Sequence, residues 1–160
     1  MSASPSPDRT RFTGEWRKDA ARSDPLDCAC DALQLQGMVR GALGNMDRIS
    51  IDCDGSRVRT RTPLPRQLFI PLGAVVEEFE VGGGEREHKR RDNRPGQFKG
   101  RLVADDKGGF AIKSQWSEPL SGTATDTYSL SPDGNTLTIA ADLSVEGRQC
   151  KYSTVYTRVK

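Results

Sequence analysis

Cysteine and histidine are the first residues whose types and spacing could do chemistry in this chain. Cys28 and Cys30 form a Cys-x-Cys pair, which is a spacing that can begin a metal site. No second cysteine pair and no histidine follow at the spacing that zinc sites use, since His88 is the one histidine. We therefore expect no metal. In a reducing compartment all four cysteines should be free thiols, with Cys30 and Cys53 buried as small apolar side chains.

The sequence contains no common enzyme signature. It has no Gly-x-Ser-x-Gly motif, no phosphate-binding Gly-Lys-Ser/Thr loop and no His-Glu pair for metal hydrolysis. A catalytic triad could use only His88, which lies in a basic run with no nucleophile beside it. The sequence therefore indicates a protein that is not an enzyme, and it implies no cofactor.

Residues 85–101 form the most basic stretch of the chain, with seven lysines and arginines. Such charge could dock an acidic membrane surface, a partner protein or nucleic acid. Glu85, Glu87 and Asp92 dilute it, so a solvated hairpin is the favoured interpretation. The whole chain has a net charge of only +2. We therefore expect no nucleic acid partner and at most transient contact with a membrane.

The length of 160 residues favours one domain, which we place at residues 11–160. Residues 1–10 are rich in serine and proline and are expected to be a disordered tail. The N-terminus has no hydrophobic stretch typical of a secretory signal, and no apolar run approaches the length of a membrane span. These features predict a cytoplasmic protein, unless a targeting segment has been removed.

Two short helices are expected between residues 24 and 44. Asp24 and Pro25 are typical of a helix start, as a capping side chain followed by proline at the first helical position. Two apolar sets with helical spacing follow, out of register by about half a turn. They are Leu26, Ala29, Cys30 and Leu33, and then Leu35, Met38, Val39, Ala42 and Leu43. The break near residues 34–37 predicts two helices rather than one.

From residue 47 onward the apolar pattern changes to a period of two, which is typical of strands. Asp54-Gly55 predicts a hairpin with a two-residue turn, in which Ile51 would pair with Val58 and Asp52 with Arg57. Further strands are expected at residues 67–71, 74–81, 85–91, 97–104, 109–116, 123–130, 136–144 and 149–159. With a first strand at 11–18, the sequence predicts an up-and-down antiparallel β-barrel of about ten strands, with the helix pair after the first strand.

Several stretches occur in the order found in one protein family. They are F-x-G-x-W at residues 12–16, FIPLGAVVEEFEV at 69–81, FAIKSQW at 110–116, YSLSPDGNTLTI at 128–139 and VYTRVK at 155–160. In this order the chain resembles the fatty-acid-binding proteins and small lipocalin-like proteins of the calycin superfamily. The resemblance implies a barrel with a helical lid, with Trp16 closing the opposite end and Gly14 allowing close packing of the backbone.

The resemblance also implies an apolar ligand inside the barrel, held by an Arg-x-Tyr on the last strand and a second arginine. Here Tyr156-x-Arg158 keeps the two residue types in reversed order. The second arginine position falls near Tyr128 or Ser129, so that anchor is missing. An arginine beside a tyrosine hydroxyl can still bind a carboxylate through charge-assisted hydrogen bonds. The alternative is that Arg158 lies at a solvated chain end.

Aromatic residues on the predicted strands could line a cavity or fill a core, and the sequence does not separate these alternatives. The candidates for the lining are Phe69, Phe79, Phe110 and Trp116. The sequence therefore predicts a monomeric carrier of a small lipophilic ligand, such as a fatty acid. The alternative is a scaffold with a filled interior that binds another protein.

Overall fold

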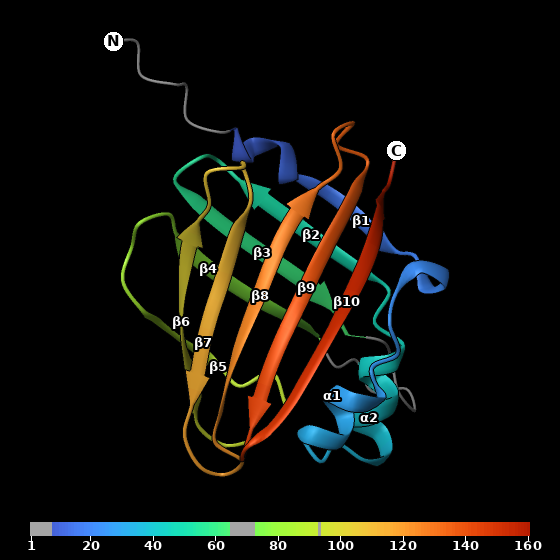
Figure 1. Ribbon diagram of the computed structural model, residues 1–160, viewed down its shortest axis with the longest axis vertical. Helices are drawn as coiled ribbons and strands as arrows, with labels where there is room; N and C mark the ends of the chain where they lie inside the picture. Colours follow the sequence, from blue (N-terminus) through green and yellow to red (C-terminus); the bar gives the residue numbers. More distant parts are fainter. Residues whose placement is uncertain (1–7, 65–72, 93) are drawn as a thin grey trace.

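The computed structural model describes residues 8–64, 73–92 and 94–160, and ten antiparallel strands in one sheet dominate it (Figure 1). The strands are β1 (Gly14–Lys18), β2 (Arg48–Cys53), β3 (Arg57–Pro63), β4 (Ala74–Glu80), β5 (Arg86–Lys89), β6 (Gln97–Ala104), β7 (Phe110–Trp116), β8 (Gly122–Leu130), β9 (Thr136–Val145) and β10 (Arg148–Arg158). The helices are the 3₁₀ turns η1 (Arg9–Phe12) and η2 (Ala20–Arg22) and the helices α1 (Asp27–Ala32) and α2 (Gly37–Gly44).

The sheet curves into a nearly closed barrel with up-and-down topology, as the sequence predicts. Strands that are neighbours in sequence pair with each other, except β4 and β5, and β1 also pairs with β10, which joins the two ends of the chain. The end strands β4 and β5 are connected by side chains: the Glu78 amide donates to His88 Nε2 at 3.2 Å, and Arg86 forms ion pairs with Glu78 and Glu80. Val81, just after β4, bridges to Leu102 of β6. The gap between β4 and β5 is therefore the one place where the described wall is not a continuous ladder.

One end of the barrel is filled by a packed apolar cluster that includes Phe12, Trp16 and Phe110. The Trp16 side chain is fully buried, and its indole N–H donates to the Phe12 carbonyl at 3.0 Å. Phe12 belongs to η1, which lies across this end (Figure 1). Trp16 thus has the packing role that its position after Gly14 predicts.

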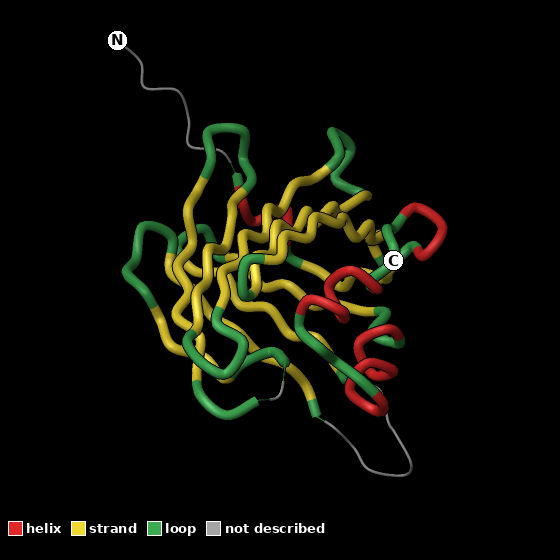
Figure 2. Tube along the Cα trace, turned by 60° about the horizontal axis from the view of Figure 1, so that its bottom comes forward, coloured by secondary structure: helices red, strands yellow, loops and turns green. Residues whose placement is uncertain are grey.

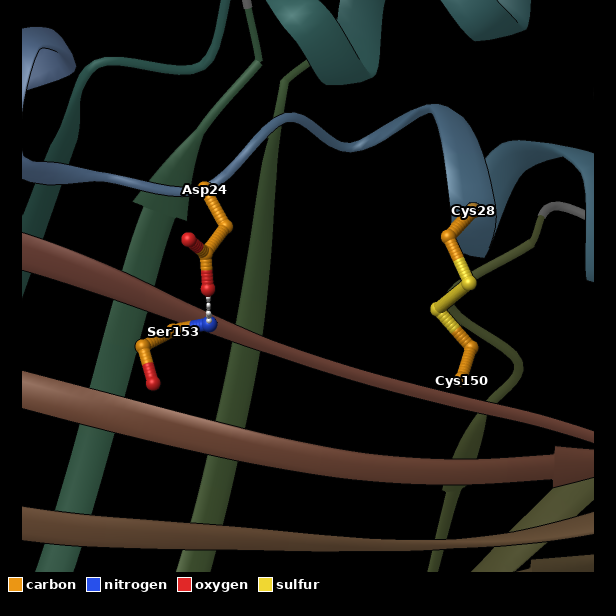
Figure 3. The surroundings of a disulfide bond; sticks show 4 residues. All are labelled: Asp24, Cys28, Cys150 and Ser153. Carbon is orange, nitrogen blue, oxygen red and sulfur yellow. Dashed lines mark hydrogen bonds between the residues drawn. A yellow bond between two sulfur atoms is a disulfide. The ribbon is translucent and has the colours of Figure 1, made fainter.

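The helix pair lies at the opposite end (Figures 1 and 2), and its break near residues 34–37 is as predicted. The predicted cap is wrong, because α1 begins at Asp27 and the Asp24 carboxylate instead accepts from the Ser153 amide on β10 at 2.8 Å. The prediction of four free thiols is also wrong. Cys28 of α1 and Cys150 of β10 form a disulfide, so α1 is covalently joined to the barrel wall (Figure 3).

Cys30 and Cys53 are buried free thiols, as predicted. Burial raises the pKa of both thiols, so they stay protonated and unreactive at neutral pH.

The β2–β3 hairpin has a longer loop than the sequence predicts. Cys53 pairs with Val58 and Asp52 with Arg59, so the loop contains four residues and not two. The reason lies in the Asp54 side chain, which accepts from the Ser56 and Arg57 amides at 3.0 and 2.9 Å and fixes a wider turn. The register moves by an even number of residues, so the faces of both strands stay as predicted.

Two further predictions fall wholly or partly outside the residues that the structure describes. The predicted strand at 67–71, and Phe69 within it, lie outside the described residues, as do residues 1–7 of the predicted tail. Arg9, which the sequence assigns to the tail, is buried and donates to the Gly109 and Asp105 carbonyls. Among the described residues, no helix is long and apolar enough to span a membrane.

Candidate functional site

Two adjoining cavities lie inside the barrel, between the packed cluster and the helix pair. The larger has a volume of about 210 Å³ and is lined by residues of β1–β4 and β8–β10, so it crosses the interior. The smaller, of about 130 Å³, extends toward α1 and β7. The two share lining residues, namely Leu43, Arg91, Asp126, Ala141 and Tyr152. They therefore form one interior site, which we call the barrel cavity.

A groove on the outside leads toward this cavity. It has a volume of about 430 Å³ and lies between α2, β4 and the turn after β5. Met38, Val39 and Val76 line it and are exposed apolar side chains. Arg91 lines both the groove and the barrel cavity, as do Leu43, Met46, Leu64 and Val75, so the two adjoin at these residues.

Arg91 is the centre of an ion cluster inside the barrel. Its guanidinium donates to both carboxylate oxygens of Glu77, at 2.7 and 2.6 Å, and to Asp126 at 2.8 Å. The central carbon of the guanidinium, Cζ, lies over the Phe98 ring, 5.1 Å from the ring centroid. The side chain is 38% exposed although it points inward, because it borders the cavities. Two carboxylates thus share one guanidinium beside open space.

The cluster keeps Arg91 charged. Burial disfavours the charged form, but the carboxylates of Glu77 and Asp126 outweigh this and raise the pKa of Arg91 well above its usual value. Two carboxyl groups face this one guanidinium, so the formal charge of the three side chains is −1.

Three tyrosines surround this cluster with their hydroxyls protonated. Burial is the main cause that raises the pKa of Tyr152 and Tyr156 to about 12, and the charge of Asp126 adds to it. Burial and then the charge of Asp126 also raise the pKa of Tyr128. None of these hydroxyls makes a hydrogen bond to a residue that the structure describes, so all three can bond to a molecule in the cavity.

The structure brings three of the predicted site residues to the barrel cavity. Tyr128 and Tyr156 line its larger part, and Trp116 lines the smaller part, with its indole N–H donating to the Leu120 carbonyl at 2.6 Å. Phe79 and Phe110 lie instead in the packed cluster, where they are almost fully buried and line neither part. For these two aromatic residues the structure shows core packing, the second of the alternatives that the sequence left open.

Arg158 lies at the packed end of the barrel and does not line the cavity. Its guanidinium stacks over Trp16 at 4.2 Å from the ring centroid and donates to the carbonyls of Thr13, Arg11 and Gly134. Gly14 makes room for it, since a Cβ at that position would lie 2.7 Å from Arg158 Nη1. These contacts assign Arg158 to the closure of the packed end and not to a ligand.

The Arg158→Met substitution should therefore lower stability and leave ligand affinity unchanged. Loss of the hydrogen bonds to three carbonyls should reduce the free energy of unfolding by about 1.5–3 kcal/mol. Urea denaturation measures this cost, and titration with an apolar fluorescent probe measures affinity. A large loss of affinity at full stability would contradict the placement and restore Arg158 as an anchor.

Sequence reasoning missed the three residues of the ion cluster. Glu77 and Asp126 could have been found, because each occupies an inward position in a period-two pattern, beside Phe79 and Tyr128 respectively. Arg91 could not, because it follows β5 in a turn. The same turn corrects the interpretation of residues 85–101 as a solvated hairpin: Arg90 is buried and paired with Asp92 at 2.6 Å.

Comparison with known proteins identifies the fold. A fatty acid binding protein of Schistosoma mansoni, solved with arachidonic acid, superposes with a TM-score of 0.69 at 16% identity, over 95% of this chain and 98% of that one. The chain has the fold of the fatty-acid-binding proteins. The zebrafish ileal bile acid-binding protein, solved with cholic acid, gives a TM-score of 0.65 at 16% identity, covering 93% of this chain and 99% of that one.

The same fold also occurs in secretory abundant heat soluble protein 4 from Ramazzottius varieornatus, with a TM-score of 0.67 at 12% identity and full coverage of both chains. No protein-family model and no curated protein sequence matches the chain. The calycin-like fold that the sequence predicts is thus confirmed by structural similarity, while the function must be argued from the site.

Proposed function

We propose that the protein binds and carries a small lipophilic molecule inside its barrel, and that it does not act on this molecule as an enzyme. The observation that carries the proposal is the barrel cavity, which is lined by apolar side chains and a few convergent polar groups. This composition is typical of small-molecule sites. Fatty acids and related amphiphiles are the first class to test, because the solved relatives of similar fold hold arachidonic acid and cholic acid.

The size of the cavity favours a short or compact ligand. Its two parts, of about 210 and 130 Å³, together lie near the lower end of the range of about 300–1,000 Å³ for ligand sites. Entry through the groove beside α2 would expose the ligand to the apolar side chains of Met38 and Val39. The alternative of a scaffold with a filled interior receives less support, because the packed cluster fills only one end.

The compartment in which the carrier acts is part of the proposal. The sequence predicts the cytoplasm, whereas the Cys28–Cys150 pair is typical of an oxidising compartment. We favour the oxidising compartment, with the protein acting as a monomer that contacts membranes only transiently.

Filling the cavity should abolish binding of a neutral apolar probe such as N-phenyl-1-naphthylamine. Ala141 lines both parts of the cavity, so Ala141→Phe places a ring where the ligand would lie. We expect saturable binding to the wild type and an affinity at least about tenfold lower in the variant, which corresponds to about 1.4 kcal/mol. Fluorescence titration measures both values.

Ala140→Phe is the matched control, because Ala140 is the neighbouring residue on β9 and is exposed on the outer face. This variant should bind the probe like the wild type. Equal binding by Ala141→Phe and Ala140→Phe, or no binding by the wild type, would contradict a ligand site in the barrel.

A further inference from the structure

The ion cluster on the wall of the barrel cavity has two carboxyl groups and one guanidinium. Glu77 and Asp126 are both buried, and together they have only Arg91 as an ion-pair partner among the described residues. Arg91 gives two of its hydrogen bonds to Glu77 and one to Asp126. Buried charges in proteins are paired, because an uncompensated buried charge is costly. One further positive charge near Asp126 would complete the cluster.

An acceptor on Asp126 is open to the cavity. Asp126 Oδ2 accepts from Arg91, whereas Oδ1 has no hydrogen-bond partner in the described part of the chain. The only side-chain polar atom there that is both fully enclosed and unpartnered is His88 Nδ1. Asp126 is 8% exposed, so the open side of Oδ1 faces the cavity that Asp126 lines.

Hydroxyl oxygens supply further acceptors on the same cavity. Three residues that are at least nine-tenths buried line it without a side-chain hydrogen bond to a described residue, namely Thr60, Tyr128 and Thr154. A protonated amine has three N–H donors and no acceptor, so it can bond to Asp126 and to two hydroxyl oxygens at once. A carboxylate has acceptors only and would lie beside an ion cluster of charge −1.

We propose that the ligand of the barrel cavity is a lipophilic amine, with its ammonium group bound to Asp126 beside Arg91 and its apolar part along the cavity wall. This inference rests on the proposed function, since it names the chemical class of that ligand. It differs from the expectation of a fatty acid, which requires an arginine that is free to bind the carboxylate. Arg91 is already occupied by two carboxylates, and Arg158 lies at the packed end.

Lys18 is the competing anchor for an anionic ligand. It lines the larger part of the cavity, is half-buried, and forms no ion pair with a described residue. It is the last residue of β1, however, and remains partly in contact with solvent. A half-solvated ammonium attracts a carboxylate more weakly than a buried carboxylate attracts an amine, because solvent screens the charge.

Three ten-carbon probes that differ only in the head group test the proposal on the wild type. Decylamine, decanol and decanoate are titrated at pH 7.5 by displacement of the neutral fluorescent probe. We expect decylamine to bind about 10- to 100-fold more tightly than decanoate, with the affinity of decanol between them. This ratio corresponds to one charge-assisted hydrogen bond to a buried partner. The order of affinities needs no variant, so it decides the proposal even if a substitution at the cluster impairs folding.

The Asp126→Asn variant tests the assigned anchor. It should weaken decylamine at least about tenfold and change decanol by less than about threefold, because only the amine loses a charged partner. Asp142→Asn is the matched control, since Asp142 lies on the outer face of β9 and is half-exposed. Binding of all three probes should be unchanged in it.

The possible outcomes separate the inference from the proposed function. Binding of decanol together with decanoate at least as tight as decylamine would overturn the amine assignment and leave the carrier function standing. Loss of the decanoate affinity in Lys18→Met would then identify Lys18 as the anchor. Failure of all three probes to bind the wild type would overturn the carrier function, and the amine assignment with it.

Discussion

Removal of the Cys28–Cys150 disulfide by substitution of both cysteines with alanine should lower the free energy of unfolding by about 2–5 kcal/mol. The bond joins residues 122 positions apart, so its loss frees a long loop in the unfolded chain and raises the entropy of that state. Urea denaturation of the oxidised wild type, the reduced wild type and the double variant measures the cost. The reduced wild type and the double variant should coincide, since both lack the bond.

A second measurement connects this bond to the compartment. The protein is unfolded and alkylated as it is extracted from its cells, and the alkylated cysteines are counted. If the disulfide is present in the cell, only Cys30 and Cys53 are alkylated. Four alkylated cysteines would instead support the cytoplasmic location that the sequence predicts. Equal stability of the oxidised wild type and the double variant would show that the bond does not tie α1 to β10 in the folded protein.

The strands of the barrel could be predicted because the inward and outward faces alternate along the chain. Ile49, Ile51 and Cys53 show this on β2, where each is buried between more exposed neighbours. The predicted faces of β2 and β3 are correct although the predicted hairpin register is wrong. The loop at Asp54 is two residues longer than predicted, and a shift of two residues keeps each side chain on the same face. An odd shift would have turned every apolar side chain outward.

The helix start shows where local sequence rules stop. Asp24-Pro25 has the chemistry of a cap, but the Asp24 carboxylate accepts from the Ser153 amide of β10, and α1 begins three residues later. A capping interaction is worth about 1 kcal/mol, so a tertiary hydrogen bond of similar strength can replace it. The partner lies 129 residues away, which no local pattern records.

The candidate site was the least predictable part of the molecule for the same reason. The reversed Tyr156-x-Arg158 pair points to a carboxylate anchor, yet Arg158 finds backbone carbonyls at the packed end while Tyr156 lies on the cavity. Tyr156 and Arg158 lie on the same, inward face of β10. Because this strand runs from one end of the barrel to the other, residues on one face can belong to different sites. The ion cluster joins residues from β4, β8 and a turn, and only the closed barrel brings them together.

Loss of the central guanidinium of this cluster should have an effect as large as loss of the disulfide. Arg91→Met keeps an unbranched apolar stem but leaves Glu77 and Asp126 without their cation, and breaking a buried ion pair in this way costs about 3–5 kcal/mol. We expect the low end of this range, because the cavity lets water reach one side of the cluster. Urea denaturation gives the change in the free energy of unfolding.

Two further variants separate this cost from a general effect of removing an arginine. Arg57→Met removes a pair with Glu78 on the exposed side of β3 and β4, and it should cost less than about 1 kcal/mol. Adding Glu77→Gln to Arg91→Met should recover part of the loss, since the amide removes one of the two uncompensated charges. If Arg91→Met costs no more than Arg57→Met, the two carboxylates are hydrated well enough without a cation. The excess carboxylate of the cluster would then give no reason for the cavity to prefer a cationic ligand.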